Sequence, residues 1–181
     1  EIIFILILAI GIDLSLGEPA RFIHPVVWMG KVTSLLEKGN KSRYSIVQFI
    51  YGSGIVLFNI GLFAVPAFLI LLYLKNLNLI AYIIAAAVLL KPTFSLRELR
   101  QAALRVRGLL VEDKLDEARL ELRSLVSRDT AGLSKSLLGS AAVESVAESA
   151  SDSFVAPIFY FLLLGVPGAI AYRVVNTMDA M

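Results

Sequence analysis

A run of 29 residues without a single charge, Ile46–Leu74, constrains the fold of this chain more than any other feature. A helix needs about 20 predominantly apolar residues to cross the hydrocarbon core of a bilayer, so this run predicts a transmembrane helix with room to tilt. The composition agrees, since 57% of the residues are hydrophobic and only 18% are charged, against about 45–50% and about 25% in soluble domains. We therefore expect an all-α, multi-pass helical membrane protein that forms one domain over residues 1–181.

Two other apolar stretches are expected to cross the bilayer with this run. Residues 1–16 are interpreted as the remnant of an earlier span. Residues 76–91 contain a stretch of 14 uncharged residues, which can just cross if Lys75 and Lys91 snorkel from its ends. The first stretch lacks an initiator methionine and a basic leading region, so it does not resemble a signal peptide, and we expect the sequence to be a fragment.

A further uncharged stretch, residues 154–172, carries Gly165-Val166-Pro167-Gly168 at its centre. This combination is typical of a turn. Two alternatives stay open for the stretch: a single span, or two half-helices folded back as a re-entrant hairpin. Irregular backbone at membrane depth is tolerated only where protein or a water-filled cavity covers it.

The distribution of basic residues predicts the orientation in the membrane. If the three expected spans all cross, residues 17–45 and 92–153 emerge on the same side. These two segments hold most of the lysines and arginines, whereas the opposite loop offers only Lys75. Because basic residues gather in cytoplasmic loops, we expect a protein of the cell membrane with both large polar segments in the cytoplasm.

The residue types limit the chemistry that this chain can perform. It has no cysteine and one histidine, His24, which excludes disulfide scaffolds, thiolate metal sites and multi-histidine metal sites. A net charge of +2 gives no nucleic-acid footprint. The remaining chemistry rests on carboxylates, amides, hydroxyls and arginines. His24, which precedes Pro25, could donate or accept a proton, although a lone loop histidine more often only forms hydrogen bonds.

The segment 92–153 reads as amphipathic helices. Ser95 and Glu98 have the spacing of a capping box, which predicts a helix start. Apolar residues then recur at helical spacing up to a break near Glu112-Asp113, and a second stripe follows. We expect a cytoplasmic helical hairpin packed on the membrane domain, and we assign it no catalysis.

A helix expected over Ser134–Asp152 carries three carboxylates on one face. Glu144, Glu148 and Asp152 are spaced at i, i+4 and i+8. Like charges at this spacing oppose each other by about 0.2–0.5 kcal/mol per pair, which indicates that cations or hydrogen-bond donors meet the stripe. Mg²⁺ prefers oxygen ligands and often bridges carboxylates to substrate phosphates. A functional site is therefore favoured over a solvated acidic face or a structural pairing with nearby arginines.

Two polar clusters flank this helix in the sequence. The first, Arg128-Asp129-Thr130, is either turn and cap chemistry or a phosphate-directed arginine beside a carboxylate. The second follows the Gly165 turn and consists of Arg173, Asn176, Thr177 and Asp179. A re-entrant geometry for residues 154–172 would return this second cluster to the cytoplasmic side, near the carboxylates.

Short stretches along nearly the whole chain together resemble one known family. In order they are Asp13-Leu14, Gly17-Glu18-Pro19, His24-Pro25-Val26, Ala118-Arg119, Arg128-Asp129-Thr130-Ala131-Gly132-Leu133, Ala142-Val143-Glu144-Ser145-Val146-Ala147-Glu148, Ser151-Asp152, Val155-Ala156-Pro157, Pro167-Gly168-Ala169 and Asn176-Thr177-Met178-Asp179. The set resembles the CobD/CbiB family of adenosylcobinamide-phosphate synthases, membrane proteins of cobalamin biosynthesis.

The resemblance implies an enzyme that performs ATP-dependent amide ligation. Aminopropanol or its O-phosphate would be joined to a propionate carboxylate of adenosylcobyric acid, with Mg²⁺ and ATP, to give cobinamide or its phosphate. The implied catalytic residues are Glu144, Glu148, Asp152 and Asp129, of which the first three would also hold Mg²⁺. The implied substrate- and phosphate-binding residues are Arg128, Thr130, His24, Arg173, Asn176, Thr177 and Asp179. The partners are then the corrinoid, the amine and the lipid bilayer, with no nucleic acid, and assembly with other membrane enzymes of cobalamin biosynthesis stays open.

The chain departs from the family pattern at two places. Gly17-Glu18-Pro19 stands where the family usually has Gly-Asp-Pro, and Glu148-Ser149-Ala150-Ser151-Asp152 lacks the usual Asn and Thr after the glutamate. The family's C-terminal portion is absent as well.

Two other functions stay open for this chain. The alternatives are a non-catalytic membrane sensor or regulator of the same superfamily, and a small-molecule transporter that uses the break at Gly165-Val166-Pro167-Gly168.

Overall fold

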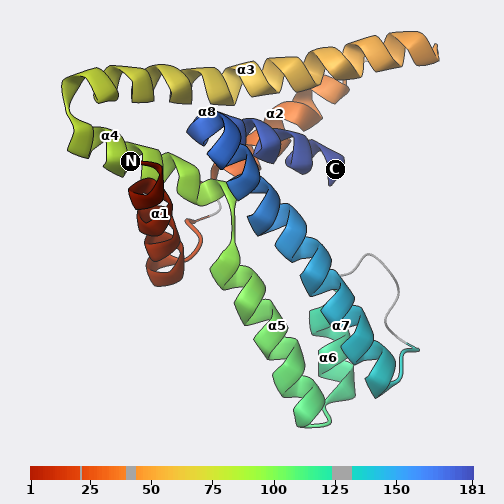
Figure 1. Ribbon diagram of the computed structural model, residues 1–181. Helices are drawn as coiled ribbons and strands as arrows, with labels where there is room; N and C mark the ends of the chain where they lie inside the picture. The colour runs from red at the N-terminus through yellow and green to blue at the C-terminus, as the bar shows by residue number, and fades with distance from the viewer. Residues whose placement is uncertain (21, 40–43, 124–131) are drawn as a thin grey trace.

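The computed structural model describes residues 1–20, 22–39, 44–123 and 132–181, and in these ranges the chain is helical with no strand (Figure 1). The first four helices are α1 (Ile2–Leu16), α2 (Pro25–Glu37), α3 (Ser45–Leu77) and α4 (Leu79–Leu90). They are followed by the short η1 (Lys91–Thr93), then α5 (Leu96–Val111), α6 (Leu115–Leu122), α7 (Lys135–Ala150), the π-helix η2 (Ser151–Val155) and α8 (Ala156–Asp179). The expectation of an all-helical fold is confirmed.

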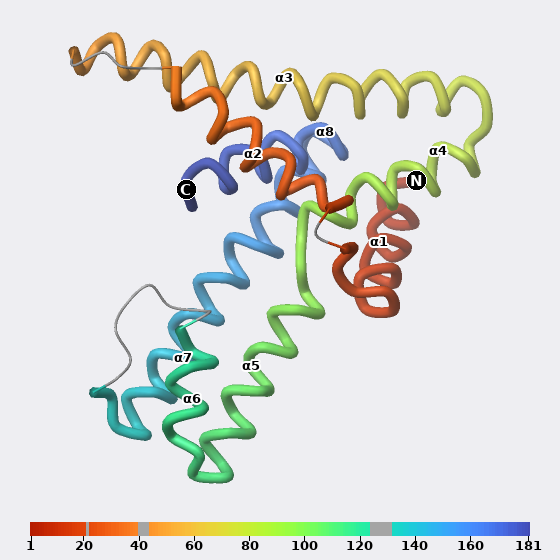
Figure 2. Tube along the Cα trace, turned by 180° about the vertical axis from the view of Figure 1, so that it is seen from behind, coloured from red at the N-terminus to blue at the C-terminus, as the bar shows by residue number. Residues whose placement is uncertain are grey.

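Helix α3 is the longest element and lies across the others (Figure 1). Viewed from behind, α2 and the C-terminal part of α8 lie together beneath it (Figure 2). The chain turns back at Asn78, whose side chain accepts the backbone N–H groups of Ile80 at 2.8 Å and Ala81 at 3.1 Å. The two stretches expected to span, 46–74 and 76–91, therefore form a helical hairpin whose turn lies after Leu77, because Asn78 supplies the cap.

Within the described ranges, three helical stretches are long and apolar enough to cross a membrane: Ser45–Leu77, Leu79–Val111 and Lys135–Asp179. Helix α1 is apolar but shorter. The second stretch joins α4 to α5 through extended backbone at Phe94, and Figure 1 shows the two helices meeting at an angle. Helix α4 alone has 12 residues, or about 18 Å. These stretches indicate a membrane protein.

Helix α8 reverses direction at Gly165, where φ is 70° and ψ is −165°. Tyr172 consequently stacks on Tyr160 with ring centroids 5.1 Å apart, and its hydroxyl donates to the carbonyl of Asp152 at 3.1 Å. A continuous helix would separate residues 152 and 172 by about 30 Å, so this contact requires a fold-back. The turn chemistry of this segment is confirmed, while re-entry of the fold-back into a bilayer stays a prediction.

Helices α5, α6 and α7 form a separate bundle below α3 (Figure 1). Its core is small and consists of Val106, Leu122, Leu138, Ala141 and Ala142. The expected break after the first amphipathic helix is confirmed, since α5 ends at Val111 and Asp113 adopts a positive φ of 62°. The helix expected over Ser134–Asp152 is present as α7, with Ser134 as its cap, but the α-helix ends at Ala150 and the wider turn of the π-helix carries Asp152.

Candidate functional site

Charged side chains gather where the end of α1, the loop before α2, η1, the start of α5 and the second half of α8 meet. We call this group the charged junction, and it consists of Asp13, Glu18, His24, Lys91, Arg97 and Arg173. Most of its members come from segments far apart in the sequence. Because the members are separated by whole helices and loops in the sequence, no local motif reveals the group.

Lys91 lies at the centre of the charged junction. Its Nζ is 3.3 Å from Oδ1 of Asp13 and 3.0 Å from Oε1 of Glu18, and its side chain is only 6% exposed. The expectation that Lys91 snorkels to a membrane interface is therefore wrong. A lysine buried beside two carboxylates is stabilised by them, since an isolated buried charge is costly.

The ends of α1 and α5 cap each other. Oδ2 of Asp13 accepts the backbone N–H of Arg97 at 2.9 Å, and the Arg97 guanidinium donates to the carbonyls of Ser15 at 2.8 Å and Leu14 at 3.3 Å. Backbone N–H and carbonyl groups that have no partner within their own helix are thus hydrogen-bonded to the neighbouring helix. The capping box expected at Ser95 does not form, because its side chain makes no cap bond.

The carboxyl group of Glu18 joins the parts of the charged junction. Burial alone would raise its pKa, but the neighbouring Lys91, His24 and Ser95 outweigh burial and hold the pKa of Glu18 below its ordinary value of 4.5. Glu18 therefore stays ionised and carries the negative charge that the neighbouring cations need.

His24 caps α2 and contacts Glu18. Its Nδ1 accepts the backbone N–H of Val26 at 3.2 Å, and its Nε2 lies 2.6 Å from Oε2 of Glu18. Because Nδ1 acts as an acceptor, the ring proton is assigned to Nε2, which donates to Glu18. Of the two alternatives for His24, this geometry favours a hydrogen-bonding residue that positions the carboxylate.

Arg173 approaches the charged junction from α8. It interacts electrostatically with Glu18, its Nη1 donates to Oδ1 of Asn176 at 3.2 Å, and Thr177 donates to its carbonyl at 2.7 Å. Its Nε is buried and has no hydrogen-bond partner in the part of the chain that the structure describes. The same side chain lines a mainly apolar cavity of about 260 Å³ that also includes Trp28. A guanidinium with an unused N–H beside a cavity is suited to bind an anionic group.

The expected carboxylate stripe is only partly joined to the charged junction. Only the backbone next to Asp152 borders it, since the carbonyl of Ser153 accepts the backbone N–H of Ser95 at 3.2 Å, and Asp152 itself is exposed. Glu148 and Glu144 lie about one and two turns further along α7, and both are exposed. Among the described residues no three acidic or histidine side chains are grouped to hold a metal ion, so the magnesium site stays a prediction.

Other predicted site residues have different placements. Asp179 is exposed at the end of α8. Arg128, Asp129 and Thr130 lie outside the described residues. The structure therefore brings together His24, Arg173, Asn176, Thr177 and the neighbourhood of Asp152. Glu144 and Glu148 lie apart from this group, along α7.

Sequence reasoning missed Asp13, Glu18, Lys91 and Arg97 as site residues. A signal was available, because an ionisable residue at the end of an apolar run, such as Asp13 or Lys91, indicates a partner or a function. Only the fold identifies which residue that partner is.

Comparisons with known proteins give one family. The family model described as CobD/Cbib protein matches residues 6–181. The chain is 50% identical over 181 residues to the cobalamin biosynthesis protein CobD of Dehalococcoides mccartyi, covering all of this chain and 59% of that protein. It is 44% identical over 179 residues to the probable cobalamin biosynthesis protein CobD of Methanothermobacter thermautotrophicus, covering 98% of this chain and 56% of that protein.

A third relative agrees with these two. The chain is 38% identical over 179 residues to the probable cobalamin biosynthesis protein CobD of Thermoplasma acidophilum, covering 99% of this chain and 58% of that protein. The chain thus spans less than two thirds of the length of the curated relatives it matches. No solved structure matches it.

Proposed function

This chain belongs to the CobD/CbiB protein family, and on that premise we propose that it catalyses the amide ligation of cobalamin biosynthesis. Its homologues indicate the pathway. The proposed reaction joins aminopropanol, or its O-phosphate, to a propionate carboxylate of adenosylcobyric acid at the expense of ATP. The observation that carries the proposal is Arg173: its buried Nε has no partner among the described residues, its side chain lines a small cavity, and it interacts electrostatically with the ionised Glu18.

The proposed reaction has two steps. An oxygen of the propionate carboxylate attacks the γ-phosphorus of ATP, which forms an acyl phosphate and releases ADP. The amine nitrogen then attacks the acyl carbon, the C–O bond to phosphate breaks, and the nitrogen loses a proton as the amide forms. An acyl phosphate makes the carboxylate a better electrophile because phosphate is a good leaving group.

The residues of this chain have separate roles in the proposal. Arg173 binds the phosphate end of the small substrate with its free N–H, and Asn176 fixes the guanidinium. Glu18 and His24 position Arg173 from the other side. The backbone next to Asp152 borders this group, and Asp152 accepts the proton of the amine.

The remaining predicted residues would serve the nucleotide. Exposed carboxylates on one face of α7, Glu144 and Glu148, offer the oxygen ligands that Mg²⁺ takes alongside phosphate oxygens. Bound there, Mg²⁺ would neutralise charge on the phosphates. Arg128, Asp129 and Thr130 are proposed to complete the phosphate site.

The decisive experiment is a ligation assay. The purified full-length protein, in detergent or lipid, is incubated with adenosylcobyric acid, ATP, Mg²⁺ and either aminopropanol phosphate or aminopropanol, and the amide is detected by mass spectrometry. We expect a product that disappears when ATP is omitted. No product with either amine, from a folded protein that still binds the corrinoid, would favour the regulator. Substrate movement across vesicles without ATP turnover would favour the transporter.

A further inference from the structure

Asp152 lies in the π-helix η2, where the backbone hydrogen-bonding pattern is interrupted. The N–H of Ala156 donates to the carbonyl of Ser151, and the next residue, Pro157, has no N–H to donate. The carbonyl of Asp152 is therefore left without a donor from the following turn. The hydroxyl of Tyr172 takes this place and donates to that carbonyl at 3.1 Å.

The ring of Tyr172 is itself held by aromatic side chains of the other arm of α8. It stacks on Tyr160 with the ring centroids 5.1 Å apart and an angle of 19° between the ring planes. Phe159 meets the ring of Tyr160 edge-on, with centroids 5.6 Å apart. Stacked and edge-to-face pairs are the arrangements that aromatic rings prefer, so the phenol keeps one orientation. The hydroxyl of Tyr172 consequently reaches the π-helix from a fixed point.

Tyr172 also connects the π-helix to Arg173. It directly precedes Arg173 in α8, and it interacts electrostatically both with Arg173 and with Asp152. A second hydrogen bond fixes the same stretch of the π-helix, since the carbonyl of Ser153 accepts the backbone N–H of Ser95, just before α5, at 3.2 Å. The backbone that carries the Asp152 carboxylate is thus held by α8 and by α5 together.

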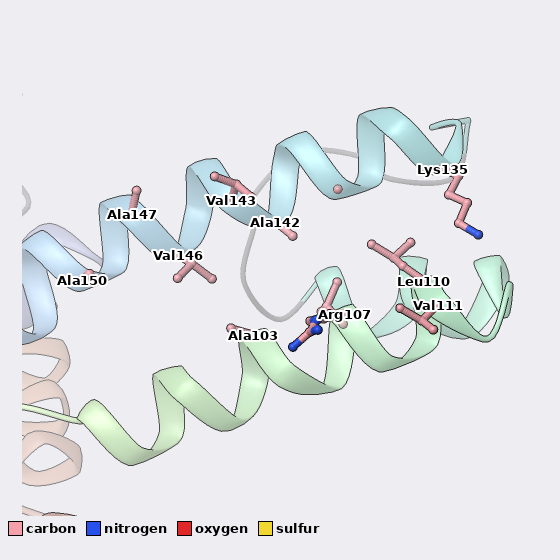
Figure 3. Close-up of a pocket in the computed structure, with 12 residues that line it drawn as sticks. Ala103, Arg107, Leu110, Val111, Lys135, Ala142, Val143, Val146, Ala147 and Ala150 are labelled. Atoms are coloured by element: carbon pink, nitrogen blue, oxygen red, sulfur yellow. The ribbon is translucent and has the colours of Figure 1, made fainter.

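The groove between α5 and α7, shown in Figure 3, contrasts with the π-helix. The α7 residues that line it from Gly139 to Ala150 are all apolar, and Ala150 is the last residue before η2. This wall offers no polar side chain to a substrate that Arg173 holds. Beyond it, the π-helix presents the carboxylate of Asp152, which is exposed.

We propose that Tyr172 is a positioning residue of the amine site, which holds Asp152 in place relative to Arg173. The proposal rests on the proposed function, in which Arg173 binds the phosphate end of the small substrate and Asp152 receives the proton of its amine. Tyr172 acts on the substrate through the backbone of Asp152 rather than by contact. The ammonium and phosphate groups of one short molecule are then recognised together, which favours aminopropanol phosphate over an alkyl phosphate that lacks the nitrogen.

The test measures the binding of two small phosphates separately from catalysis. Isothermal titration calorimetry of the purified full-length protein in detergent gives the Kd of aminopropanol phosphate and of isopropyl phosphate, which has the same carbon chain without the nitrogen. We expect the wild type to prefer aminopropanol phosphate about fivefold, the upper end for an exposed ion pair. Tyr172→Phe should reduce this preference to about twofold or less, because Asp152 is no longer held. The Kd of isopropyl phosphate should not change, because Arg173 is intact.

Two further variants control this result. Tyr160→Phe removes a hydroxyl from the same aromatic stack, and that hydroxyl makes no hydrogen bond in the described part of the chain, so both Kd values should match the wild type. Asp152→Asn should abolish the preference, because a neutral amide replaces the carboxylate. Adding Tyr172→Phe to Asp152→Asn should then change nothing further, since a residue that acts through Asp152 has no carboxylate left to position.

Each outcome separates the positioning role from the ligase. A preference that Tyr172→Phe leaves unchanged, or equal weakening of both phosphates, overturns the positioning role, and ligation by the wild type would leave the proposed function standing. A preference that depends on Tyr172 and Asp152, without ligation by the wild type, supports the positioning role and overturns the ligase. A wild-type protein that binds both phosphates equally, or neither of them, overturns the positioning role whatever the ligation assay gives.

Discussion

Lys91 and Asp13 form a buried ion pair that joins the end of α4 to the end of α1. Nζ of Lys91 is 3.3 Å from Oδ1 of Asp13, and the two side chains are 6% and 1% exposed. The other oxygen of Asp13 caps α5 through the backbone N–H of Arg97. One carboxylate thus connects three helices, and Nζ of Lys91 also lies 3.0 Å from Oε1 of Glu18.

Removing one member of this pair should destabilise the protein strongly. Asp13→Asn leaves Lys91 buried beside Glu18 alone, and breaking a buried pair in this way typically costs about 3–5 kcal/mol. The measurement is the midpoint of thermal unfolding in detergent. The double variant Asp13→Asn with Lys91→Met should be more stable than Asp13→Asn, because no unpaired charge is then left at this position. Equal stability of the single variant and the wild type would contradict the role of the pair.

The free energy of unfolding should also fall at acidic pH, because Glu18 then becomes protonated. The folded-state pKa of Glu18 lies below its ordinary value of 4.5, so the unfolded state binds its proton at a higher pH than the folded state. The stabilisation from Glu18 is therefore fully present above about pH 4.5 and is lost as pH falls through the lower folded-state pKa. Unfolding midpoints measured from pH 7 down to pH 3 should drop less steeply for Glu18→Gln than for the wild type. Parallel curves for the two proteins would contradict this prediction.

Arg173 should determine the preference between the two forms of the amine. If its free N–H binds phosphate, Arg173→Gln raises KM for aminopropanol phosphate by about 10–100-fold, the range expected for a lost hydrogen bond to a charged group. KM for unphosphorylated aminopropanol should change little. Steady-state kinetics with both amines measures the ratio. Equal changes in the two KM values would mean that Arg173 acts on the fold rather than on the phosphate.

Glu144 and Glu148 test the predicted magnesium site. Both side chains are exposed on α7, so Glu144→Gln and Glu148→Gln should abolish ligation while the protein stays folded, as the unfolding midpoint would show. A rise in the Mg²⁺ concentration needed for half-maximal rate in any residual activity would identify the metal as the cause. Full activity of both variants would remove these residues from the site.

Local features of the fold could be predicted from the sequence because their causes are local. The cap of α7 at Ser134 and the end of α5 before Asp113 depend on neighbouring residues. The turn at Gly165 likewise follows from glycine and proline chemistry within four residues.

The charged junction could not be predicted in the same way. A lysine at the end of an apolar run, such as Lys91, can either snorkel to the membrane interface or pair with a buried carboxylate. Only its distance to Asp13 in the folded protein decides between the two. Ser95 has the spacing of a capping box, but its side chain makes no cap bond at the start of α5. Such outcomes depend on tertiary contacts, and a periodic pattern carries no information about them.

The fold-back of α8 depends on a second glycine, and this gives the last prediction. A Cβ at Gly168 would lie 2.5 Å from Cβ of Leu164 and 2.7 Å from the carbonyl oxygen of Tyr160. Gly168→Ala should therefore force the two arms of α8 apart, with a loss of about 1–3 kcal/mol in stability, as for other overpacked sites. Because Arg173 follows the fold-back, ligation should fall together with stability.

The distance between the arms can be measured directly, because the chain has no cysteine of its own. Spin labels on Val155→Cys and Val175→Cys, which replace exposed residues, report the separation by pulsed electron resonance. The distance should lengthen or broaden when Gly168→Ala is added. Gly61→Ala in α3 is the matched control, since no atom lies within 4 Å of the added methyl group, and it should change neither distance nor activity. An unchanged distance in Gly168→Ala would show that the two arms tolerate a side chain, and the close approach at Gly168 would then not hold the fold-back.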